Sequence, residues 1–301
     1  MHLFYADHFV LPLPPGHRFP MEKYSRLRER LMASGEFDLA DFRVPDAADD
    51  TALLRAHSPG YLQRVITGQL SAAEQRRIGF PWSPEMVERS RRSAGATLAA
   101  CRSALTLGCA ANMAGGTHHA YRDFGSGFCV FNDAAVAALA MRAEGRVARV
   151  AIIDCDVHQG DGTAAILAGT PEVFTLSLHG DKNFPFRKTV SDQDVALPDG
   201  TGDADYLAAL APALDALVTR FRPELVIYLA GADPFEGDRL GRLALTFDGL
   251  ARRDEMVLST CRDRRIPVAI AMAGGYGHDI DDTVAIHATT LLTAARLFRS
   301  P

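Results

Sequence analysis

The sequence predicts an α/β fold in which a parallel β-sheet is covered by helices on both faces. Short, nearly continuous apolar runs alternate along the chain with longer amphipathic stretches. A strand buried on both faces shows such an unbroken run, and alternation with helices is typical of parallel sheets. The predicted strands are the first residues of the chain, Val150–Asp154, Val173–His179, Leu225–Ala230 and Val268–Ala273. The predicted helices cover residues 84–107, 132–144, 203–221, 246–265 and 280–299.

The composition is that of an ordinary globular protein. The 301 residues are 48% hydrophobic and 23% charged, and no change in composition marks a boundary, so we expect a single domain over residues 1–301. The formal net charge of −5 gives no general basic surface for nucleic acid. No apolar run approaches the roughly 18 residues of a membrane span, so no membrane partner is expected.

The N-terminus and the cysteines favour a cytoplasmic location. Residues 1–8 lack the basic start and the long apolar region of a signal peptide. The chain has five cysteines, and none of them are in a Cys-x-x-Cys spacing. A reduced compartment therefore fits best.

Two segments are predicted to lack regular structure. Residues 12–20 are rich in Pro and Gly, and residues 180–202 carry Phe184, Phe186 and a Pro-Asp-Gly turn. Long loops without structure of their own are usually functional rims or disordered segments. The aromatic residues favour an ordered rim for the second segment.

The strand end at residues 152–162 concentrates carboxylates and an imidazole. Side chains alternate along a strand, so Asp154, Asp156 and His158 would project on one side if the extended conformation continued. An Asp and a His two residues apart can bind zinc or manganese. The alternative is a turn in which residues 161–163 only cap the next helix.

A glycine-flanked pair of histidines, His118 and His119, follows another short apolar stretch. Paired histidines are often only surface polarity. The preceding Gly-Gly would let the backbone approach a ligand closely, and histidine titrates near neutral pH. Beside a metal ion, the pair would suit general acid–base catalysis.

Two further strand ends carry chemically suggestive residues. Asp233 follows one apolar strand and is interpreted either as a helix cap or as a third metal ligand. Tyr276 lies between glycines after another strand and is either an exposed turn residue or a donor to a developing oxyanion. Ligands of parallel sheets bind at the carboxyl ends of the strands, which favours the functional interpretations.

Eight short motifs occur in the order found in one known family. They are GGTHH at 115–119, GFC at 127–129, DCDVHQGDG at 154–162, LSLHG at 176–180, LPDGTGD at 197–203, GADP at 231–234, GDRLGRLALT at 237–246 and AGGYG at 273–277. The chain resembles the zinc-dependent histone deacetylases and their bacterial relatives, which include acetylpolyamine amidohydrolases and acetoin-utilisation proteins. Its loops are most similar to those of bacterial members grouped with the small class IV deacetylases.

The resemblance implies the arginase/deacetylase fold, a three-layer α/β/α arrangement around an eight-stranded parallel sheet. It also implies a zinc-dependent amidohydrolase that removes an acyl group, expected to be acetyl, from an acylated lysine, a peptide or a small amine. Zinc would be bound by Asp156, His158 and Asp233, and the sequence leaves open whether iron replaces it. The oligomeric state and the physiological substrate also stay open.

The same resemblance assigns the acid–base roles. His118 and His119 would be the catalytic pair, with Asp154 oriented toward His118 and Asp161 toward His119. Carboxylates in such positions fix the tautomer of an imidazole and raise its basicity. Asp154 would then point away from the zinc ion. Tyr276 would hold the oxyanion that forms when metal-activated water attacks the acyl carbonyl.

Substrate contacts and a second cation also follow from the resemblance. The tunnel wall would consist of Gly127, Phe128, His158, Leu240 and either Phe184 or Phe186. Arg18 matches an arginine that lines the exit for acetate in relatives. A potassium ion close to the site would be bound by Asp154, Ser177 and the backbone of Leu178, with backbone help from Asp156 and His158.

One departure from the family pattern concerns the rim. Many relatives carry a rim aspartate that binds the peptide backbone, but residues 78–83 contain no carboxylate. Recognition of a histone-like peptide is therefore not expected, and Trp82 is predicted to shape the entrance instead.

The sequence also bears on three alternative classes of protein. An arginase-like enzyme with two manganese ions would need carboxylates where the chain has Gly160 and Phe235. A non-catalytic acyl-ligand-binding relative would be expected to lack part of the residue set, which is complete here. An acetylpolyamine amidohydrolase typically carries a loop insertion, which this sequence lacks.

Overall fold

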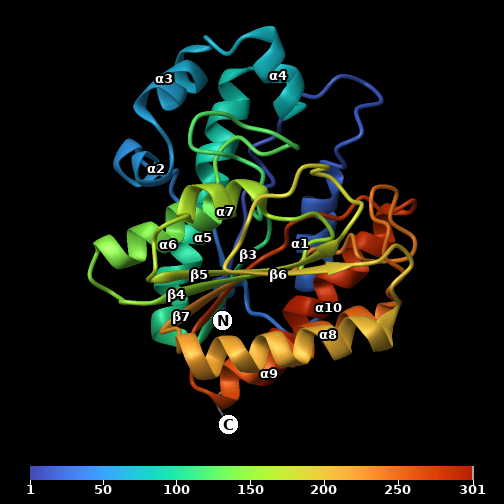
Figure 1. Cartoon of the computed structure of the whole chain (residues 1–301). Coiled ribbons are helices and arrows are strands. Elements are labelled where there is room, and N and C mark those ends of the chain that lie inside the picture. The colour runs from blue at the N-terminus through green and yellow to red at the C-terminus, as the bar shows by residue number, and fades with distance from the viewer. Residues whose placement is uncertain (300–301) are drawn as a thin grey trace.

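The computed structural model describes residues 1–299, and its eight strands form one parallel sheet (Figure 1). The strand order is β2-β1-β3-β8-β7-β4-β5-β6, and every neighbouring pair is parallel. The strands are β1 His2–Phe4, β2 Phe42–Arg43, β3 Cys109–Asn112, β4 Val150–Asp154, β5 Val173–Gly180, β6 Gln193–Leu197, β7 Leu225–Leu229 and β8 Val268–Ala271. The predicted eight-stranded parallel sheet is therefore confirmed.

Three strands were not predicted because their residues give a weak strand signal. β2 has two residues, and β3 consists of Cys, Ala and Asn rather than branched apolar residues. β6 lies within residues 180–202, and the prediction that this segment lacks regular structure was wrong. As the edge strand, β6 alternates between exposed and partly buried residues, so it has no continuous apolar run.

The predicted helices are all present, with ends shifted by a few residues. The helices are α1 Glu22–Ala33, α2 Asp50–Ala56, α3 Pro59–Thr67, α4 Ala72–Ile78, α5 Pro84–Leu107, α6 Asp133–Ala143, α7 Asp161–Leu167, α8 Asp203–Ala216, α9 Phe247–Asp263 and α10 Ile280–Phe298. The final part of the predicted helix 203–221 is a π-helical segment, Leu217–Phe221. The short helices α2, α3 and α4 begin at side-chain caps provided by Asp49, Ser58 and Ser71.

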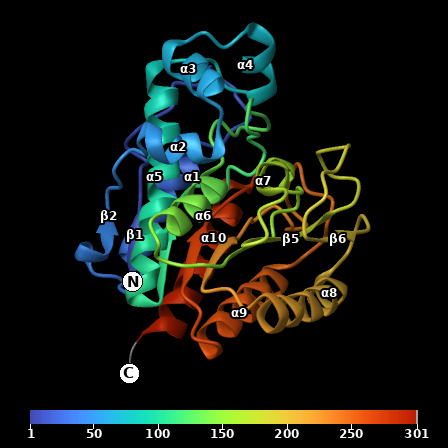
Figure 2. The same ribbon diagram turned by 60° about the vertical axis from the view of Figure 1, so that its left-hand side comes forward.

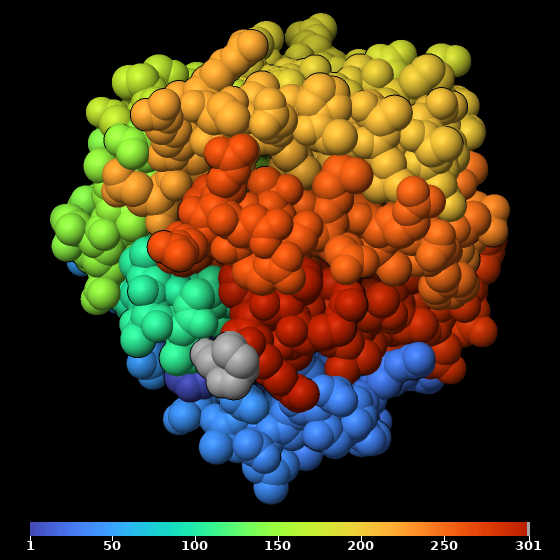
Figure 3. All heavy atoms as spheres, turned by 90° about the horizontal axis from the view of Figure 1, so that it is seen from below, coloured from blue at the N-terminus to red at the C-terminus, as the bar shows by residue number. Residues whose placement is uncertain are grey.

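Helices cover both faces of the sheet (Figures 1 and 2). Figure 3 shows α8, α9 and α10 side by side on one face, and α1 continues this layer beside α10. α5 and α6 pack together on the other face. Successive side chains of a strand point to opposite faces of the sheet, so each strand contributes to the hydrophobic core on both faces. In β4, Ala151 and Ile153 pack on the first face, and Val150 and Ile152 pack on the second.

The centre of the sheet determines where the site forms. β8, β7 and β4 are neighbours, and their register aligns Ala271 with Leu229 and Leu229 with Asp154. The loops that follow these three strands therefore leave the sheet side by side, at the edge where parallel sheets bind ligands.

Among residues 1–299, no helix combines the length and the apolar character that a membrane crossing requires.

Candidate metal centre and active site

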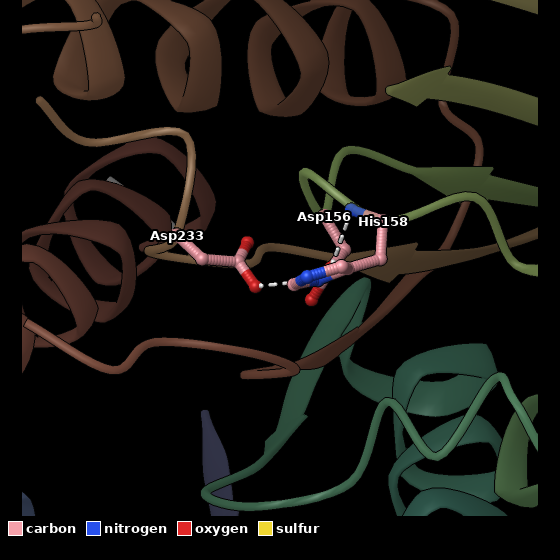
Figure 4. Close-up of side chains that lie close together, drawn as sticks. All are labelled: Asp156, His158 and Asp233. Atoms are coloured by element: carbon pink, nitrogen blue, oxygen red, sulfur yellow. Dashed lines mark hydrogen bonds and ion pairs between the residues drawn. The ribbon is translucent and has the colours of Figure 1, made fainter. Parts of the chain in front are cut away.

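Three potential metal ligands meet at the carboxyl edge of the sheet. Asp156 and His158 follow β4, and Asp233 follows β7. One ligand atom from each side chain lies within 4.8 Å of the others, and all three residues are buried. Figure 4 shows the three side chains converging. Two carboxylates and one imidazole are a donor set that suits zinc.

The backbone of neighbouring loops holds the two carboxylates. Gly274 N donates a hydrogen bond to Asp156 Oδ2 at 2.7 Å, and Val157 N donates one to Asp233 Oδ1 at 2.9 Å. A Cβ atom at position 274 would overlap both carboxylates, so only glycine lets the loop after β8 come this close.

One carboxylate oxygen in this cluster lacks a partner. Within residues 1–299, Asp233 Oδ2 is buried without a hydrogen bond, although His158 Nδ1 lies 3.2 Å away. Burial and the neighbouring Asp156 carboxylate raise the pKa of Asp233. A bound cation would supply the missing partner and offset the repulsion between the two carboxylates. The three residues therefore fit a metal ion.

Two histidine–aspartate pairs stand beside the cluster. His118 Nδ1 lies 2.7 Å from Asp154 Oδ2, and His119 Nδ1 lies 2.6 Å from Asp161 Oδ1. The two imidazole rings are neighbours, with centroids 4.2 Å apart. Asp154 therefore lies against His118. In both pairs the Nδ1 atom is engaged, which leaves Nε2 for chemistry.

The two histidines differ in charge at neutral pH. Burial would lower the pKa of His118, but Asp154 and Asp156 outweigh it and raise the pKa to about 9. Burial and the positive charge of His118 lower the pKa of His119 to about 4, against the opposite influence of Asp161. His119 is thus neutral and able to accept a proton, whereas His118 is charged.

Asp133, a residue that the sequence analysis did not identify, fixes the loop that carries the histidines. This carboxylate is fully buried at the start of α6. It accepts hydrogen bonds from Gly116 N at 3.0 Å and Thr117 N at 2.7 Å, and from the hydroxyl of Thr97. Because its role depends on a turn 16 residues earlier, no local sequence signal identifies it.

Tyr276 lies across the cavity from the histidines, next to aromatic neighbours. Its ring centroid is 6.0 Å from that of Phe128 and 6.3 Å from that of Phe19. Burial raises the pKa of the Tyr276 phenol, so the group keeps its proton at neutral pH. A protonated phenol beside the metal cluster can donate a hydrogen bond to a substrate oxygen.

Two further residues that sequence reasoning missed hold Tyr276 in place. Asp238 accepts hydrogen bonds from Tyr276 N at 2.6 Å and Leu240 N at 2.7 Å, so it joins two loops of the cavity. Lys23 is 2% exposed, and its ammonium group lies 3.4 Å from Ala273 O and 5.3 Å from the Tyr276 ring centroid. Lys23 belongs to the charge-rich helix α1, whose sequence gives no sign of a buried lysine.

A cavity of about 650 Å³ leads to the metal cluster. Its lining includes all six substrate-contact residues expected from the sequence, namely Arg18, Gly127, Phe128, Phe184, Phe186 and Leu240. The Phe184 ring centroid is 4.9 Å from that of His119, whereas Phe186 is 89% exposed. Phe184 therefore contributes to the inner wall, and Phe186 stands at the rim.

Gly127 lets the cavity wall pass close to the histidine pair. Its φ is +53°, and a Cβ atom at this position would lie 2.7 Å from His119 Cδ2. Glycine is therefore required both for the backbone conformation and for the contact with His119.

One expectation for the cavity was wrong. Trp82 does not line it, because the indole packs over Gly68 and donates a hydrogen bond to Val65 O at 2.7 Å. Arg18 does line the cavity, as an exposed side chain, and its role at an exit for acetate stays a prediction.

The residues expected to bind potassium lie on adjacent strands. Asp154 at the end of β4 pairs in register with Ser177 of β5, and Leu178 follows Ser177. The Ser177 hydroxyl is 2.9 Å from His179 Nδ1. Ser177 and Leu178 are outside the lining of the cavity.

Comparison with known families agrees with this geometry. Residues 17–292 match the histone deacetylase domain. The chain belongs to the histone deacetylase family. Alignments with relatives cover most of the chain. It is 44% identical to an uncharacterised protein of Picosynechococcus sp. over 97% of both chains.

Two named relatives of this histone deacetylase family member are more distant. Histone deacetylase 2 of Arabidopsis thaliana is 32% identical over 86% of this chain and 70% of its own length. A histone deacetylase-like amidohydrolase of Pseudomonas aeruginosa is 32% identical over 88% of this chain and 74% of its own length.

Solved structures show the same fold at lower identity. The acetylpolyamine aminohydrolase of Burkholderia pseudomallei has a TM-score of 0.78, with 24% identity over 99% of both chains. The HD domain of HDA15 has a TM-score of 0.80, with 22% identity over 99% of this chain and 90% of that domain. Together with the parallel sheet, these likenesses establish the arginase/deacetylase fold.

Proposed function

We propose that this histone deacetylase family member is a zinc-dependent amide hydrolase that removes an acyl group, with acetyl as the first expectation, from an acylated lysine or a related amine. One observation carries the proposal: two histidine–aspartate pairs, a tyrosine and a three-residue metal cluster converge on one cavity. Membership in a family that includes a histone deacetylase-like amidohydrolase supports the same reaction class.

Asp156, His158 and Asp233 would hold the zinc ion. Bound zinc would polarise the acyl carbonyl and make a nearby water molecule more acidic. Three protein ligands leave a coordination position open, as catalytic zinc sites require. The unpartnered oxygen of Asp233 supports a resident cation at this position.

His119 would act as the general base. Its Nδ1 atom is bonded to Asp161, and its pKa of about 4 keeps the imidazole neutral. Nε2 can therefore take a proton from the attacking water and return it to the leaving amine. His118, held by Asp154, would stabilise the negative charge that develops.

Tyr276 would donate its phenolic proton in a hydrogen bond to the oxygen of the attacked carbonyl. The raised pKa keeps the phenol protonated, and Asp238 fixes the backbone from which it projects. Such a donor stabilises the tetrahedral intermediate more than it stabilises the bound substrate, because the oxygen becomes negative only in the intermediate.

Phe128, Phe184 and Leu240 would surround the aliphatic stem of the acylated amine, since their side chains line the path to the cluster. Apolar walls with a few convergent polar groups are typical of small-molecule sites. The complete set of cluster, pair and tyrosine argues against a non-catalytic relative. The likeness to an acetylpolyamine aminohydrolase concerns the fold and favours no polyamine.

Potassium is proposed to bind beside β4 and β5, through Asp154, Ser177 and the backbone of Leu178. The register that places Asp154 opposite Ser177 supports this site. Replacement of potassium by sodium in the assay buffer should change the hydrolysis rate, and equal rates would count against a functional potassium ion.

The proposal is tested with purified protein and a fluorogenic acetyl-lysine substrate. We expect about one zinc per chain, hydrolysis that stops with a hydroxamate inhibitor, and loss of hydrolysis in His119→Ala with zinc retained. Metal analysis also separates zinc from iron. Two manganese ions per chain would instead indicate an arginase-like centre, and hydrolysis unaffected by His119→Ala would refute the assigned mechanism.

A further inference from the structure

Four basic side chains line the mouth of the cavity. They are Arg18 before α1, Arg77 near the end of α4, Lys182 after β5 and Arg242 between β7 and α9. All four are exposed. They come from separate segments of the chain, so the positive charge does not reflect one basic stretch of sequence.

Each of these basic residues stands next to a residue of the apolar wall. Arg18 precedes Phe19, whose ring centroid is 5.3 Å from that of Phe128. Arg77 O accepts a hydrogen bond from Gly127 N at 3.1 Å. Lys182 and Arg242 each lie two residues from a wall residue, Phe184 and Leu240 respectively. The four basic side chains therefore lie at the exposed outer part of the apolar passage.

Acidic side chains neutralise little of this charge. The only carboxylates in the described lining are Asp156 and Asp233, which are buried in the metal cluster. Arg242 pairs with Asp199 at 3.2 Å on the exposed surface. Arg77 lies 4.7 Å from the Phe124 ring centroid, a contact that leaves its charge in place. Within residues 1–299, Arg18 and Lys182 make no ion pair.

The charge of the rim is opposite to that of the whole chain. The sequence has 37 acidic and 32 basic side chains, with a formal net charge of −5. A local field of one sign at a cleft concentrates ligands of the opposite sign and repels those of the same sign. The rim therefore distinguishes substrates by the charge that they carry outside the apolar passage.

We propose that this rim selects acylated amines that carry an anionic group, a carboxylate, next to the lysine-like stem, and that it rejects acylated polyamines. The inference rests on the proposed amide hydrolysis and adds its substrate class. When the acyl group reaches the metal cluster and the stem lies along Phe128 and Phe184, the rest of the substrate emerges among the basic residues. A carboxylate there gains favourable interactions, whereas the free ammonium groups of a polyamine meet like charges.

Three small substrates separate these possibilities. They are Nα-blocked Nε-acetyl-lysine as its free acid, the same compound as its neutral amide, and N-acetylputrescine, which carries a positive charge. At about 10 mM NaCl we expect kcat/KM for the acid to exceed that for the amide by about five- to tenfold, with N-acetylputrescine poorest. At about 1 M NaCl, where the Debye length is about 3 Å, the ratio of kcat/KM for the acid to kcat/KM for the amide should fall toward one.

A double variant with a matched control tests the residues themselves. Arg18→Gln combined with Lys182→Gln should reduce the acid-to-amide ratio at low salt to about two or below, because it removes the two unpaired charges. Arg187→Gln changes an exposed arginine of the same loop as Lys182, but one outside the cavity lining, and should keep the ratio of the parent protein.

The outcomes separate this inference from the proposed function. Equal use of all three substrates, or preference for N-acetylputrescine, would overturn the charge selection and leave amide hydrolysis standing. A preference that persists in the double variant would assign the selection to other residues and overturn the role of this rim. Hydrolysis of the fluorogenic acetyl-lysine substrate but of none of these three would overturn the inference alone, whereas hydrolysis of no substrate at all would refute the proposed function as well.

Discussion

Tyr276 is fixed through its backbone, while its phenol is free to meet a substrate. Its N–H donates to Asp238 at 2.6 Å, and its carbonyl accepts from Arg239 Nε at 2.8 Å. The Tyr276 ring lines the cavity. In the proposed mechanism, the loop thus holds the donor in position before the substrate arrives, as electrostatic stabilisation of a transition state requires.

Replacement of Tyr276 by Phe should therefore reduce kcat by about 10²–10³, the usual effect of losing one oxyanion donor, without loss of zinc. Steady-state kinetics and metal analysis of the same preparation provide the measurement. Tyr5→Phe, remote from the cavity, should retain full activity. An unchanged kcat in Tyr276→Phe would remove this residue from the mechanism.

Lys23→Met should lower the free energy of unfolding by about 1–3 kcal/mol, because it leaves buried carbonyl groups without their donor. The lysine ammonium lies 3.4 Å from Ala273 O and 3.3 Å from Gly275 O, on the two sides of Gly274. Urea denaturation measures the change. Arg30→Met alters an exposed residue of the same helix and should be nearly neutral. Equal stability of Lys23→Met and the parent protein would show that the lysine does not support this loop.

At the residue scale, the sequence predicts side chains that follow apolar strands better than side chains that support distant loops. Asp156, His158 and Asp233 follow apolar strands, so both their chemistry and their position at one sheet edge could be predicted. Lys23 and Asp238 could not, because their roles depend on carbonyl and N–H groups of distant loops. The exposure of Arg18 was likewise invisible in the sequence.

Among the elements, α2 ends at a histidine that connects it to two loops near the site. His57 Nδ1 lies 3.0 Å from Tyr121 O, and Nε2 lies 2.9 Å from Asn132 N. An imidazole that donates to a carbonyl and accepts from an N–H must be neutral. Asn132 is also the cap of α6, so this neutral ring links α2 to the start of α6.

Protonation of His57 should therefore destabilise the fold. Burial lowers its pKa from 6.5 to about 4. Between these values the unfolded chain binds the proton and the folded chain does not, so stability is lost as pH falls from 6.5 toward 4. The contribution of His57 over this range is about 3 kcal/mol. Chemical denaturation at several pH values should show a smaller pH slope in His57→Gln than in the parent protein.

His8→Gln is the control for this slope, because it changes an exposed histidine and should leave the pH dependence intact. Comparison of each variant with the parent protein isolates one histidine from the other buried ones. If His57→Gln kept the full slope between pH 6.5 and 4, the acid sensitivity would have to come from other groups.

The elements that were predicted correctly and those that were missed differ in burial. Central strands such as β4 and β7 are buried at every position, so their apolar runs are unambiguous. Edge strand β6 and the short helices α2 to α4 gain their order from tertiary contacts and caps, which a search for periodic patterns does not detect. The elements that position the metal cluster belong to the first group, which is why the site could be anticipated.

For the whole molecule, the metal cluster joins loops from the three central strands. Asp156 follows β4, Asp233 follows β7, and Gly274 after β8 donates to Asp156. A cation bound by the folded state alone stabilises that state by mass action. At a zinc concentration about 100 times Kd, we expect the free energy of unfolding to rise by about 2.7 kcal/mol, and a chelator should reverse the increase.

Asp233→Asn should abolish this zinc effect and yet leave the metal-free protein at least as stable as the metal-free parent. The substitution removes one of two buried carboxylates that repel each other, while an amide oxygen can still accept the hydrogen bond from Val157 N. Thermal unfolding with zinc and with chelator measures both effects. Asp205→Asn, on the exposed surface of α8, should retain the parent response to zinc. A lower midpoint for metal-free Asp233→Asn would show that this carboxylate stabilises the fold by itself, which would contradict a cluster built around a cation.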